Sequence, residues 1–396
     1  MITYQLAVCR GKHAGAMVVA VVMLGAAAGL PSAVAEPQLA GTQRATGAWA
    51  TWLDASTLLV ATSAGLGIVP IDNGDAGPRT VGVAELCLEV PPLPNPANRQ
   101  EVALVTWRNE AGGLRVSELR VVDLRKPSAT RVVATEVSSP SGKGWAAWSP
   151  DGTSIAYIAP KQGAPMRTAI VMPPVGREER TADASQAPEQ EAQVPWRAIW
   201  VVDVATGQSR QLTDTPACED TSPVFSADGR LVLFSRVAPE RVYEGRAVLS
   251  AGPLHIRSIM AVDCATGEVT TLAELIDDRH PAPAPDGAHL CFVHREAGRG
   301  RGLYVADALG KSPVRLVSDA LYPRLEGHAP VWSPDGQYVL FSALGDIHAA
   351  PRSGAKPLRL TTGAGILSDW EASPDCRRVV FRRGAAKLYT EELHWP

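Results

Sequence analysis

Five aspartates occupy similar local sequences, in which proline precedes the carboxylate or glycine follows it, in most cases both, and an apolar run comes next. They are Asp151, Asp228, Asp286, Asp335 and Asp375. A carboxylate can act as a general acid or base, but a catalytic carboxylate needs an environment of its own. Proline fixes φ, aspartate bonds the backbone two residues further on, and glycine accepts a positive φ. The recurrence therefore predicts a turn-forming role for all five.

A second set of polar and aromatic residues lies a few positions before these turns, where it could line the mouth of a channel. Its members are Trp145, Asp220, Asp278, His280, Glu326, His328, Asp369 and Trp370. Imidazole and carboxylate together make a normal ligand set for a divalent metal, so His280 and His328 are the candidate metal ligands. The tryptophans are candidate contact residues in a binding surface. The alternative is a solvated polar rim, with no catalytic residue and no cofactor.

The elements that must position these residues are short strands. A turn followed by a run rich in Val, Ile, Leu, Phe and Tyr recurs at seven places, and two further strand patterns follow most copies. Short β-type runs separated by Gly, Pro, Asp and Thr indicate an all-β fold. Four-stranded antiparallel sheets of this kind bury their faces by radial packing, as in a β-propeller. We expect one domain over residues 36–396, with seven blades favoured over six or eight.

Two segments depart from the repeat. The last unit stops at "LYTEELHWP", one strand short, and the segment that begins at Pro37 is expected to supply that strand and close the ring. Residues 161–195 are rich in Ala, Gln, Glu and Pro, which is typical of a mobile insertion. We expect this insertion to project from the rim of the third blade.

The repeats resemble those of TolB-type β-propellers. Trp148 to Gly152 and Trp332 to Gly336 match the W-S-P-D-G turn in full, and "VDVATG" and "RQLT" match the strands that follow. The resemblance implies a propeller and a TolB-like role in the Tol–Pal envelope system. The α/β domain that precedes the TolB propeller has no counterpart between Glu36 and Trp49, so we expect a stand-alone propeller. Oligogalacturonate lyases also resemble this repeat and use channel histidines to hold a metal.

The N-terminal residues indicate export. Arg10 and Lys12 precede an apolar run, and a small-x-small ending follows at Ala33 to Ala35, which is typical of a signal peptide spanning residues 1–35. A retained membrane anchor is the alternative. The formal net charge of −3 argues against nucleic-acid binding. We expect a monomeric periplasmic or extracellular protein without stable membrane insertion after cleavage.

Two functions are consistent with these patterns. The favoured one is a non-enzymatic scaffold that binds an envelope or periplasmic protein, because a propeller offers a broad rigid face. The alternative is a metal-assisted carbohydrate lyase or hydrolase with its site at the channel mouth.

Overall fold

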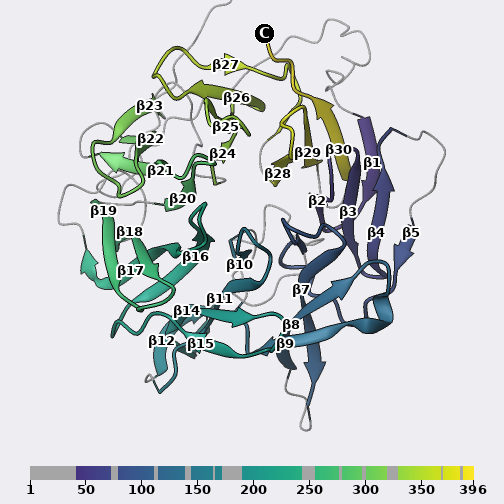
Figure 1. Ribbon diagram of the computed structural model, residues 1–396, viewed down its shortest axis with the longest axis vertical. Helices are drawn as coiled ribbons and strands as arrows, with labels where there is room; N and C mark the ends of the chain where they lie inside the picture. The colour runs from purple at the N-terminus through teal and green to yellow at the C-terminus, as the bar shows by residue number, and fades with distance from the viewer. Residues whose placement is uncertain are drawn as a thin grey trace, which may run out of the picture. The chain divides into compact units, whose positions relative to one another are not determined.

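The computed structural model describes twelve stretches of the chain, all within one compact unit, Leu39–Pro396. They are residues 42–72, 79–110, 115–138, 144–163, 166–171, 190–242, 255–275, 279–296, 300–318, 329–366, 369–383 and 387–396. These stretches form seven four-stranded antiparallel sheets that follow one another around a central axis (Figure 1). The protein is a seven-bladed β-propeller, as the repeats predicted. The expected signal peptide, residues 1–35, lies outside the described residues.

Each of the first three blades runs from the axis outward in chain order. Blade 1 consists of β2 (Trp49–Trp52), β3 (Thr57–Thr62), β4 (Gly65–Pro70) and β5 (Arg79–Val81). Blade 2 consists of β6 (Leu93–Pro94), β7 (Glu101–Asn109), β8 (Arg115–Asp123) and β9 (Arg131–Thr135). Blade 3 consists of β10 (Ala146–Trp148), β11 (Ser154–Pro160), β14 (Arg197–Asp203) and β15 (Ser209–Gln211).

The next three blades repeat this order. Blade 4 consists of β16 (Glu219–Phe225), β17 (Leu231–Val242), β18 (His255–Asp263) and β19 (Val269–Leu275). Blade 5 consists of β20 (Arg279–Pro283), β21 (His289–Glu296), β22 (Gly300–Asp307) and β23 (Val314–Ser318). Blade 6 consists of β24 (Val331–Trp332), β25 (Tyr338–Ala343), β26 (Asp346–Pro351) and β27 (Leu358–Arg359).

Blade 7 joins the two ends of the described chain. It consists of β28 (Trp370–Ala372), β29 (Arg378–Arg383), β30 (Lys387–Glu392) and, as its outer strand, β1 (Thr42–Thr46). β1 pairs antiparallel with β30, with Thr42 opposite Thr390 and Thr46 opposite Lys387. The predicted ring closure by the N-terminal segment is therefore confirmed.

Tryptophans of the repeat connect neighbouring blades. The indole nitrogen of Trp148 donates to the carbonyl oxygen of Leu93 at 2.9 Å, and that of Trp332 donates to Ala282 at 2.8 Å. Trp52 makes the same contact with Glu371 at 3.0 Å across the closed end of the ring. All three side chains are buried, so these residues pack between blades as expected. Each contributes an apolar surface and one directional bond to an inter-blade interface.

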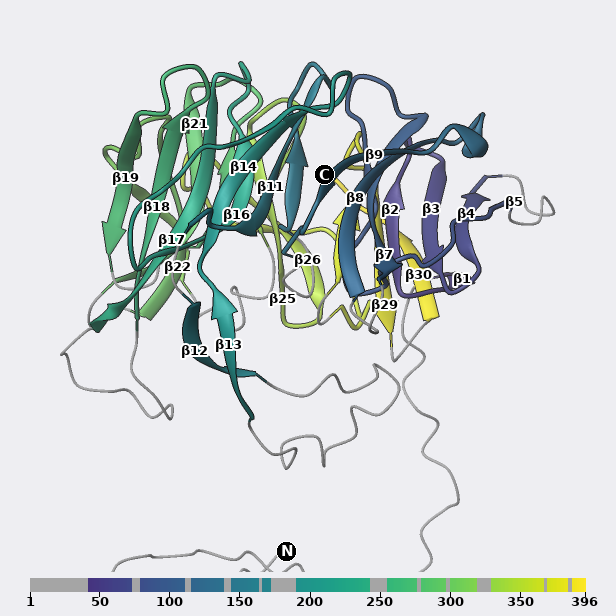
Figure 2. The same ribbon diagram turned by 90° about the horizontal axis from the view of Figure 1, so that it is seen from below.

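The two faces of the ring differ in the length of their connections. The short turns between the first and second strands, and between the third and fourth, lie on one side, here called the turn face (Figure 2). The other side, the loop face, carries the longer connections. Among them is the segment expected to be a loop at residues 161–195. Its two ends instead form an antiparallel hairpin, β12 (Met166–Val171) with β13 (Gln190–Pro195), below the ring in Figure 2.

Arginines in the outer strands join the first four blades on the turn face. Arg79 in blade 1 donates to the carbonyl oxygen of Leu124 in blade 2, at 3.3 Å. Arg131 in blade 2 donates to Val204 in blade 3, at 2.9 Å, and Arg210 in blade 3 donates to Cys264 in blade 4. Each acceptor directly follows the last residue of the third strand of its blade. We call these three contacts the arginine latches.

Candidate functional site

Asp220 lies at the loop-face end of β16, where the sequence placed the channel mouth, but it is held by an arginine. Arg236 stands opposite it in β17. The guanidinium Nε donates to Oδ1 at 2.7 Å and Nη2 donates to Oδ2 at 2.9 Å. Asp220 is fully buried, and the guanidinium carbon lies 5.2 Å from the ring centroid of Phe234. Both carboxylate oxygens are thus engaged in a bidentate pair inside the protein.

The neighbouring Glu219 repeats this arrangement with a partner from another blade. Arg197, the first residue of β14, donates from Nε to Oε1 at 3.1 Å and from Nη2 to Oε2 at 2.8 Å. Close by, the buried Lys161 donates from Nζ to the carbonyl oxygens of Thr215 and Cys218. Lys161 and Arg197 lie on either side of the β12–β13 hairpin. Blades 3 and 4 are therefore held together by charge-assisted bonds at the root of this hairpin.

Asp369 forms the corresponding pair in blade 7, where Arg382 Nη2 donates to its Oδ2. The guanidinium carbon of Arg382 also lies 5.9 Å from the ring centroid of Trp49. This places the cation between a carboxylate of its own blade and an aromatic face of blade 1. The contact of Arg382 with Trp49 connects blade 7 with blade 1 close to the ring closure.

The two tryptophans proposed as surface contacts are core residues instead. Trp145 is 0% exposed and donates its indole N–H to the carbonyl oxygen of Pro91 at 3.0 Å. Trp370 is 2% exposed and belongs to the apolar cluster between blades 6 and 7. The expectation that these side chains would meet a partner at the mouth is not supported, because neither presents its ring to solvent. Their position in the sequence revealed the strand end but not the direction of the side chain.

His280 lies in a strained part of the inner strand. Its φ is +57°, and Ser222 and Asp369, which stand at the same position six residues before the turn aspartate, have φ values of +57° and +55°. The pairing register shifts at this point in blades 4 and 5. A bulge of this kind changes the direction of a side chain, and left-handed backbone costs about 1–3 kcal/mol in a non-glycine residue. His280 itself is half-buried.

The proposed metal set can be placed only in part. Asp278, Glu326 and His328 lie outside the described residues, so the pairing of His280 with His328 stays a prediction. Asp220 and Asp369 do not fit a metal site as they stand, because each carboxylate is already neutralised by an arginine. Among the described residues, no three His, Cys, Asp or Glu side chains come together as a group that could hold a metal ion.

Four of the five turn aspartates have the predicted structural role. In each, Oδ1 accepts a bond of 2.6 Å from the hydroxyl of the serine two residues earlier and a second bond from the backbone nitrogen two residues later. The pairs of donors are Ser149 and Thr153, Ser226 and Arg230, Ser333 and Gln337, and Ser373 and Arg377. The serine bond is the main cause of a lowered pKa at Asp151, Asp228 and Asp335.

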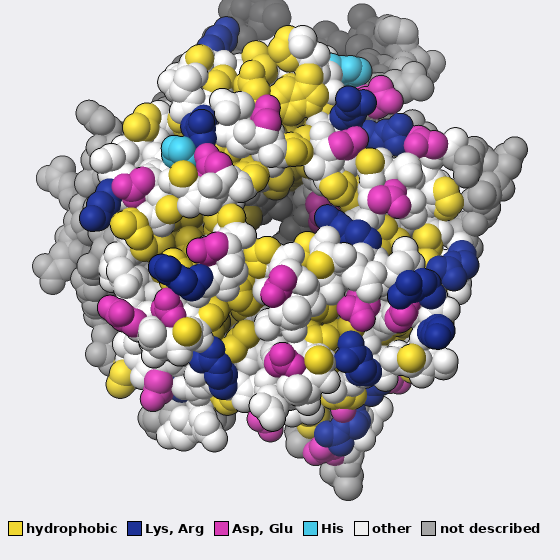
Figure 3. All heavy atoms as spheres, viewed as in Figure 1, with side chains coloured by type: hydrophobic (Ala, Val, Ile, Leu, Met, Phe, Trp, Pro, Cys, Tyr) yellow, Lys and Arg dark blue, Asp and Glu magenta, His cyan; other side chains and the backbone are white. Residues whose placement is uncertain are grey.

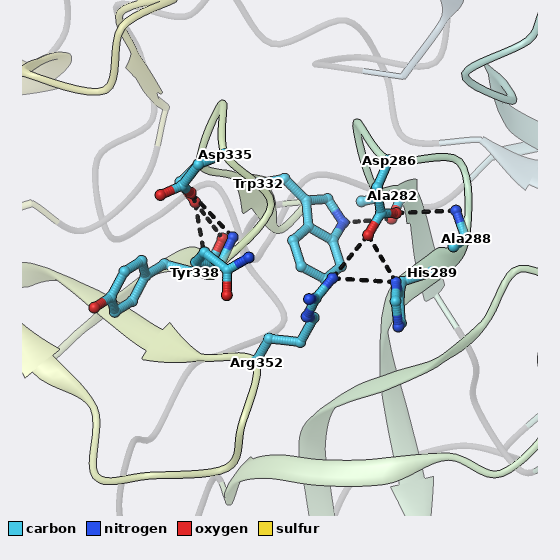
Figure 4. Close-up of polar contacts among 10 residues, drawn as sticks. Ala282, Asp286, Ala288, His289, Trp332, Asp335, Tyr338 and Arg352 are labelled. Atoms are coloured by element: carbon cyan, nitrogen blue, oxygen red, sulfur yellow. Dashed lines mark hydrogen bonds and ion pairs between the residues drawn. The ribbon is translucent and has the colours of Figure 1, made fainter.

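Asp286 departs from this pattern because Ala284 stands where the other turns have serine. Its Oδ1 accepts the backbone N–H of Ala288 at 2.9 Å. Its Oδ2 lies 2.9 Å from Nδ1 of His289 and accepts from Nη1 of Arg352, in the next blade, at 2.7 Å. Arg352 Nη1 is also 3.2 Å from His289 Nδ1, so three charged or titratable groups converge (Figure 4). Their side chains are 35%, 34% and 28% exposed.

The turn face also carries a cavity of about 460 Å³ between blades 3 and 4. Asp151, Asp203 and Asp228 line it together with Arg210 and the edge of Phe225. Figure 3 shows charged side chains of both signs dispersed over this side of the ring, with apolar side chains around the central opening. The described surface is therefore a broad mixed-charge face, and its charges are not gathered in one basic or acidic patch.

This architecture occurs in solved structures of very different sequence. An oligogalacturonate lyase from Vibrio parahaemolyticus is similar over 88% of this chain and 90% of its own, at 15% identity and a TM-score of 0.54. Dipeptidyl peptidase 4 from Porphyromonas gingivalis matches 87% of this chain at 12% identity and a TM-score of 0.50. TolB from Acinetobacter baumannii matches 85% of it at 17% identity and a TM-score of 0.41. The shared feature is the fold.

The overlap with two of these proteins is partial. The chain spans 60% of the length of the TolB structure and 50% of that of the peptidase. No protein-family model matches the sequence, and no protein of curated function is recognisably similar to it. At these identities the likeness does not transfer an activity to individual residues.

The sequence did not reveal the arginines that define this site. Arg236 and Arg382 lie within apolar strands, and their roles depend on which residue stands opposite them. The Asp286 cluster did leave a signal, because alanine replaces the turn serine in this repeat alone among the five turns. Comparing the repeats position by position would have singled it out.

Proposed function

We propose that this protein is an exported, non-enzymatic β-propeller that binds another protein of the cell envelope. The proposal rests on the ion pairs of the two described carboxylates at the expected channel mouth. Asp220 and Asp369 are each neutralised by an arginine, which leaves them poorly suited to acid–base work or metal binding. In this arrangement they hold strands and blades together. A stiff ring with a mixed-charge face is well suited to protein recognition.

Export and location follow from separate features. The first 35 residues have the pattern of a signal peptide, and the repeats resemble those of TolB, which supports a periplasmic location. No helix among the described residues is long and apolar enough to cross a membrane. A partner in the envelope, met by one rigid face of the ring, is consistent with these features.

A site-directed crosslinking experiment tests the proposal. A photo-reactive amino acid is placed at Asp203 on the turn face or at Leu344, an exposed residue of the β25–β26 turn on the loop face. The protein is expressed in its own cells, and crosslinked products are identified by mass spectrometry. We expect one envelope protein to crosslink from one face, and unlabelled propeller to compete for it. Equal, non-saturable labelling from both faces would argue against a specific partner.

A second experiment tests the alternative that the protein is a metal-assisted carbohydrate lyase or hydrolase. Metal analysis of the purified protein and an assay on oligogalacturonate with added Mn²⁺ are carried out on the wild type and on a His280→Ala/His328→Ala variant. Stoichiometric metal and cleavage activity, both lost in the variant, would overturn the scaffold proposal. Unchanged metal content in the variant, without cleavage by either protein, would support it.

A further inference from the structure

The arginine latches are present in only part of the ring. At the fourth strand of blades 1 to 6, the latch position lies two residues before a buried Val or Leu. It is occupied by Arg79, Arg131 and Arg210 in blades 1 to 3. The equivalent residues of blades 4 to 6 are Thr270, Val314 and Leu358, none of which carries a charge. Between blades 5 and 6, the contact through Asp286, His289 and Arg352 replaces the latch (Figure 4).

This contact differs from the latches in its acceptor. Each latch arginine donates to a backbone carbonyl, whose bonding capacity does not change with pH, and Arg131 also lies 3.7 Å from a carboxylate oxygen of Glu101. Arg352 instead binds a carboxylate that is shared with an imidazole. Asp286 and His289 both belong to blade 5, whereas Arg352 follows β26 of blade 6. The carboxylate therefore has one partner inside its own blade and one partner across the interface.

The charge of the imidazole decides how firmly Arg352 is held. In the neutral ring, Nδ1 either accepts from Nη1 of Arg352 at 3.2 Å or donates to Oδ2 of Asp286 at 2.9 Å, depending on the tautomer. In the doubly protonated ring, Nδ1 donates to Asp286 and a charged imidazolium lies beside the guanidinium, with 3.2 Å between Nδ1 and Nη1. Two cations then compete for one carboxylate oxygen. Protonation of the imidazole therefore favours the contact inside blade 5 over the contact across the interface.

We propose that Asp286, His289 and Arg352 form a pH-sensitive latch between blades 5 and 6, in which protonation of His289 weakens the hold of Arg352 across the interface. The latch is closed at neutral and higher pH and loosens on acidification. The three arginine latches contain no histidine, so this change does not occur in them.

The surrounding charges do not replace the histidine in this role. Asp307 stands opposite His289 in β22, but its Oδ1 accepts the backbone nitrogens of Leu309 and Lys311 at 3.0 and 2.8 Å. Lys311 is exposed. Asp335, in the turn of blade 6, accepts from Ser333 and Gln337, and Arg352 contributes to lowering its pKa. Asp286 likewise stays ionised, because the bonds from Ala288, His289 and Arg352 outweigh the effect of burial on its pKa.

The indole N–H groups between the blades provide matched reporters. Trp332 donates to Ala282 across the junction of blades 5 and 6, and Trp148 donates to Leu93 across the junction of blades 2 and 3, which Arg131 latches. Hydrogen exchange of both indoles is measured by NMR in one sample of the ¹⁵N-labelled protein. The ratio of the two rates cancels the intrinsic pH dependence of exchange. We expect the ratio of Trp332 to Trp148 to rise by about threefold or more between pH 8 and pH 5.

Variants distinguish the effect of His289 on the exchange ratio from a general effect of low pH on the protein. His289→Gln keeps a polar group but cannot change its charge, so the ratio should become independent of pH. His394→Gln, at an exposed position near the C-terminus, is the matched control and should retain the wild-type response. A constant ratio in the wild type, or an unchanged response in His289→Gln, would overturn the proposal. If His289→Gln is poorly folded, titration of Arg352→Gln gives a second test, because its ratio should be high at both pH values.

Discussion

The indole nitrogen of Trp332 lies 2.8 Å from the carbonyl oxygen of Ala282, which belongs to the preceding blade. The same bond recurs at Trp148 and Trp52, in each case to the residue that precedes the last position of an inner strand. One residue of the repeated turn thus fills the inter-blade core and fixes the rotation of its blade against the neighbour. This relationship explains why tryptophan, rather than another large apolar residue, suits that position.

Replacing this tryptophan by phenylalanine tests the contribution of the hydrogen bond between the blades. Trp332→Phe keeps an aromatic ring but removes the indole donor to the Ala282 carbonyl, a residue that also pairs with Cys291 in β21. We expect the free energy of unfolding to fall by about 1–2 kcal/mol, from one lost hydrogen bond and some lost packing. Urea denaturation followed by far-UV circular dichroism measures the change. Trp148→Phe should give a similar loss, and a loss in only one of the two variants would show that the bonds are not equivalent.

The buried pair of Asp220 and Arg236 makes a stronger prediction. Asp220→Leu leaves an arginine buried without its carboxylate, which should lower the free energy of unfolding by about 3–5 kcal/mol. The double variant Asp220→Leu/Arg236→Met removes both charges and should recover most of this loss. Chemical denaturation of the three proteins gives the comparison. Equal destabilisation in the single and double variants would mean that the charge itself is not responsible.

Ring closure predicts an effect of the N-terminal strand. A protein that begins at Gly47 lacks β1 and exposes the edge of β30, so we expect a clear decrease in Tm. A protein that begins at Gly41 keeps every residue that pairs with β30 and serves as the control. Differential scanning calorimetry measures both. Identical Tm values for the two truncated proteins would contradict the closure of the ring by β1.

The turn aspartates predict a loss of stability in acid. The serine bond lowers the pKa of Asp335 in the folded protein, so its contribution is present above the unfolded pKa of about 3.9 and is lost as the pH falls through the folded value. Asp335→Asn should therefore be less stable than the wild type at neutral pH, and the difference should shrink in acid. Urea denaturation across this range checks the trend, with the exposed Asp214→Asn as the charge control. A difference that stays constant with pH would contradict it.

The blades and turns could be predicted from the sequence because their determinants are local. The Pro-Asp-Gly turn, the apolar run after it and the missing last strand all lie within single repeats. The contacts of the candidate site could not be predicted in this way. Asp220 meets Arg236 only through the bulged register of β16 and β17, and Asp286 meets Arg352 across 66 positions of sequence. Trp145 illustrates the same limit, because its burial depends on a neighbouring blade.

The pairing of β1 with β30 closes the ring of blades. Thr42 and Thr390 come together from nearly opposite ends of the chain, so this contact closes a far longer loop than any hairpin within a blade. Contacts of high sequence separation form slowly, because the entropy of loop closure must be overcome first. The strands of each of the first six blades follow one another in the chain, so each of these blades can form locally. Blade 7 can form only when β1 pairs with β30, from the other end of the ring. In a circular permutant whose new termini lie between two blades, all four strands of blade 7 are consecutive. We expect this permutant to refold faster than the natural chain.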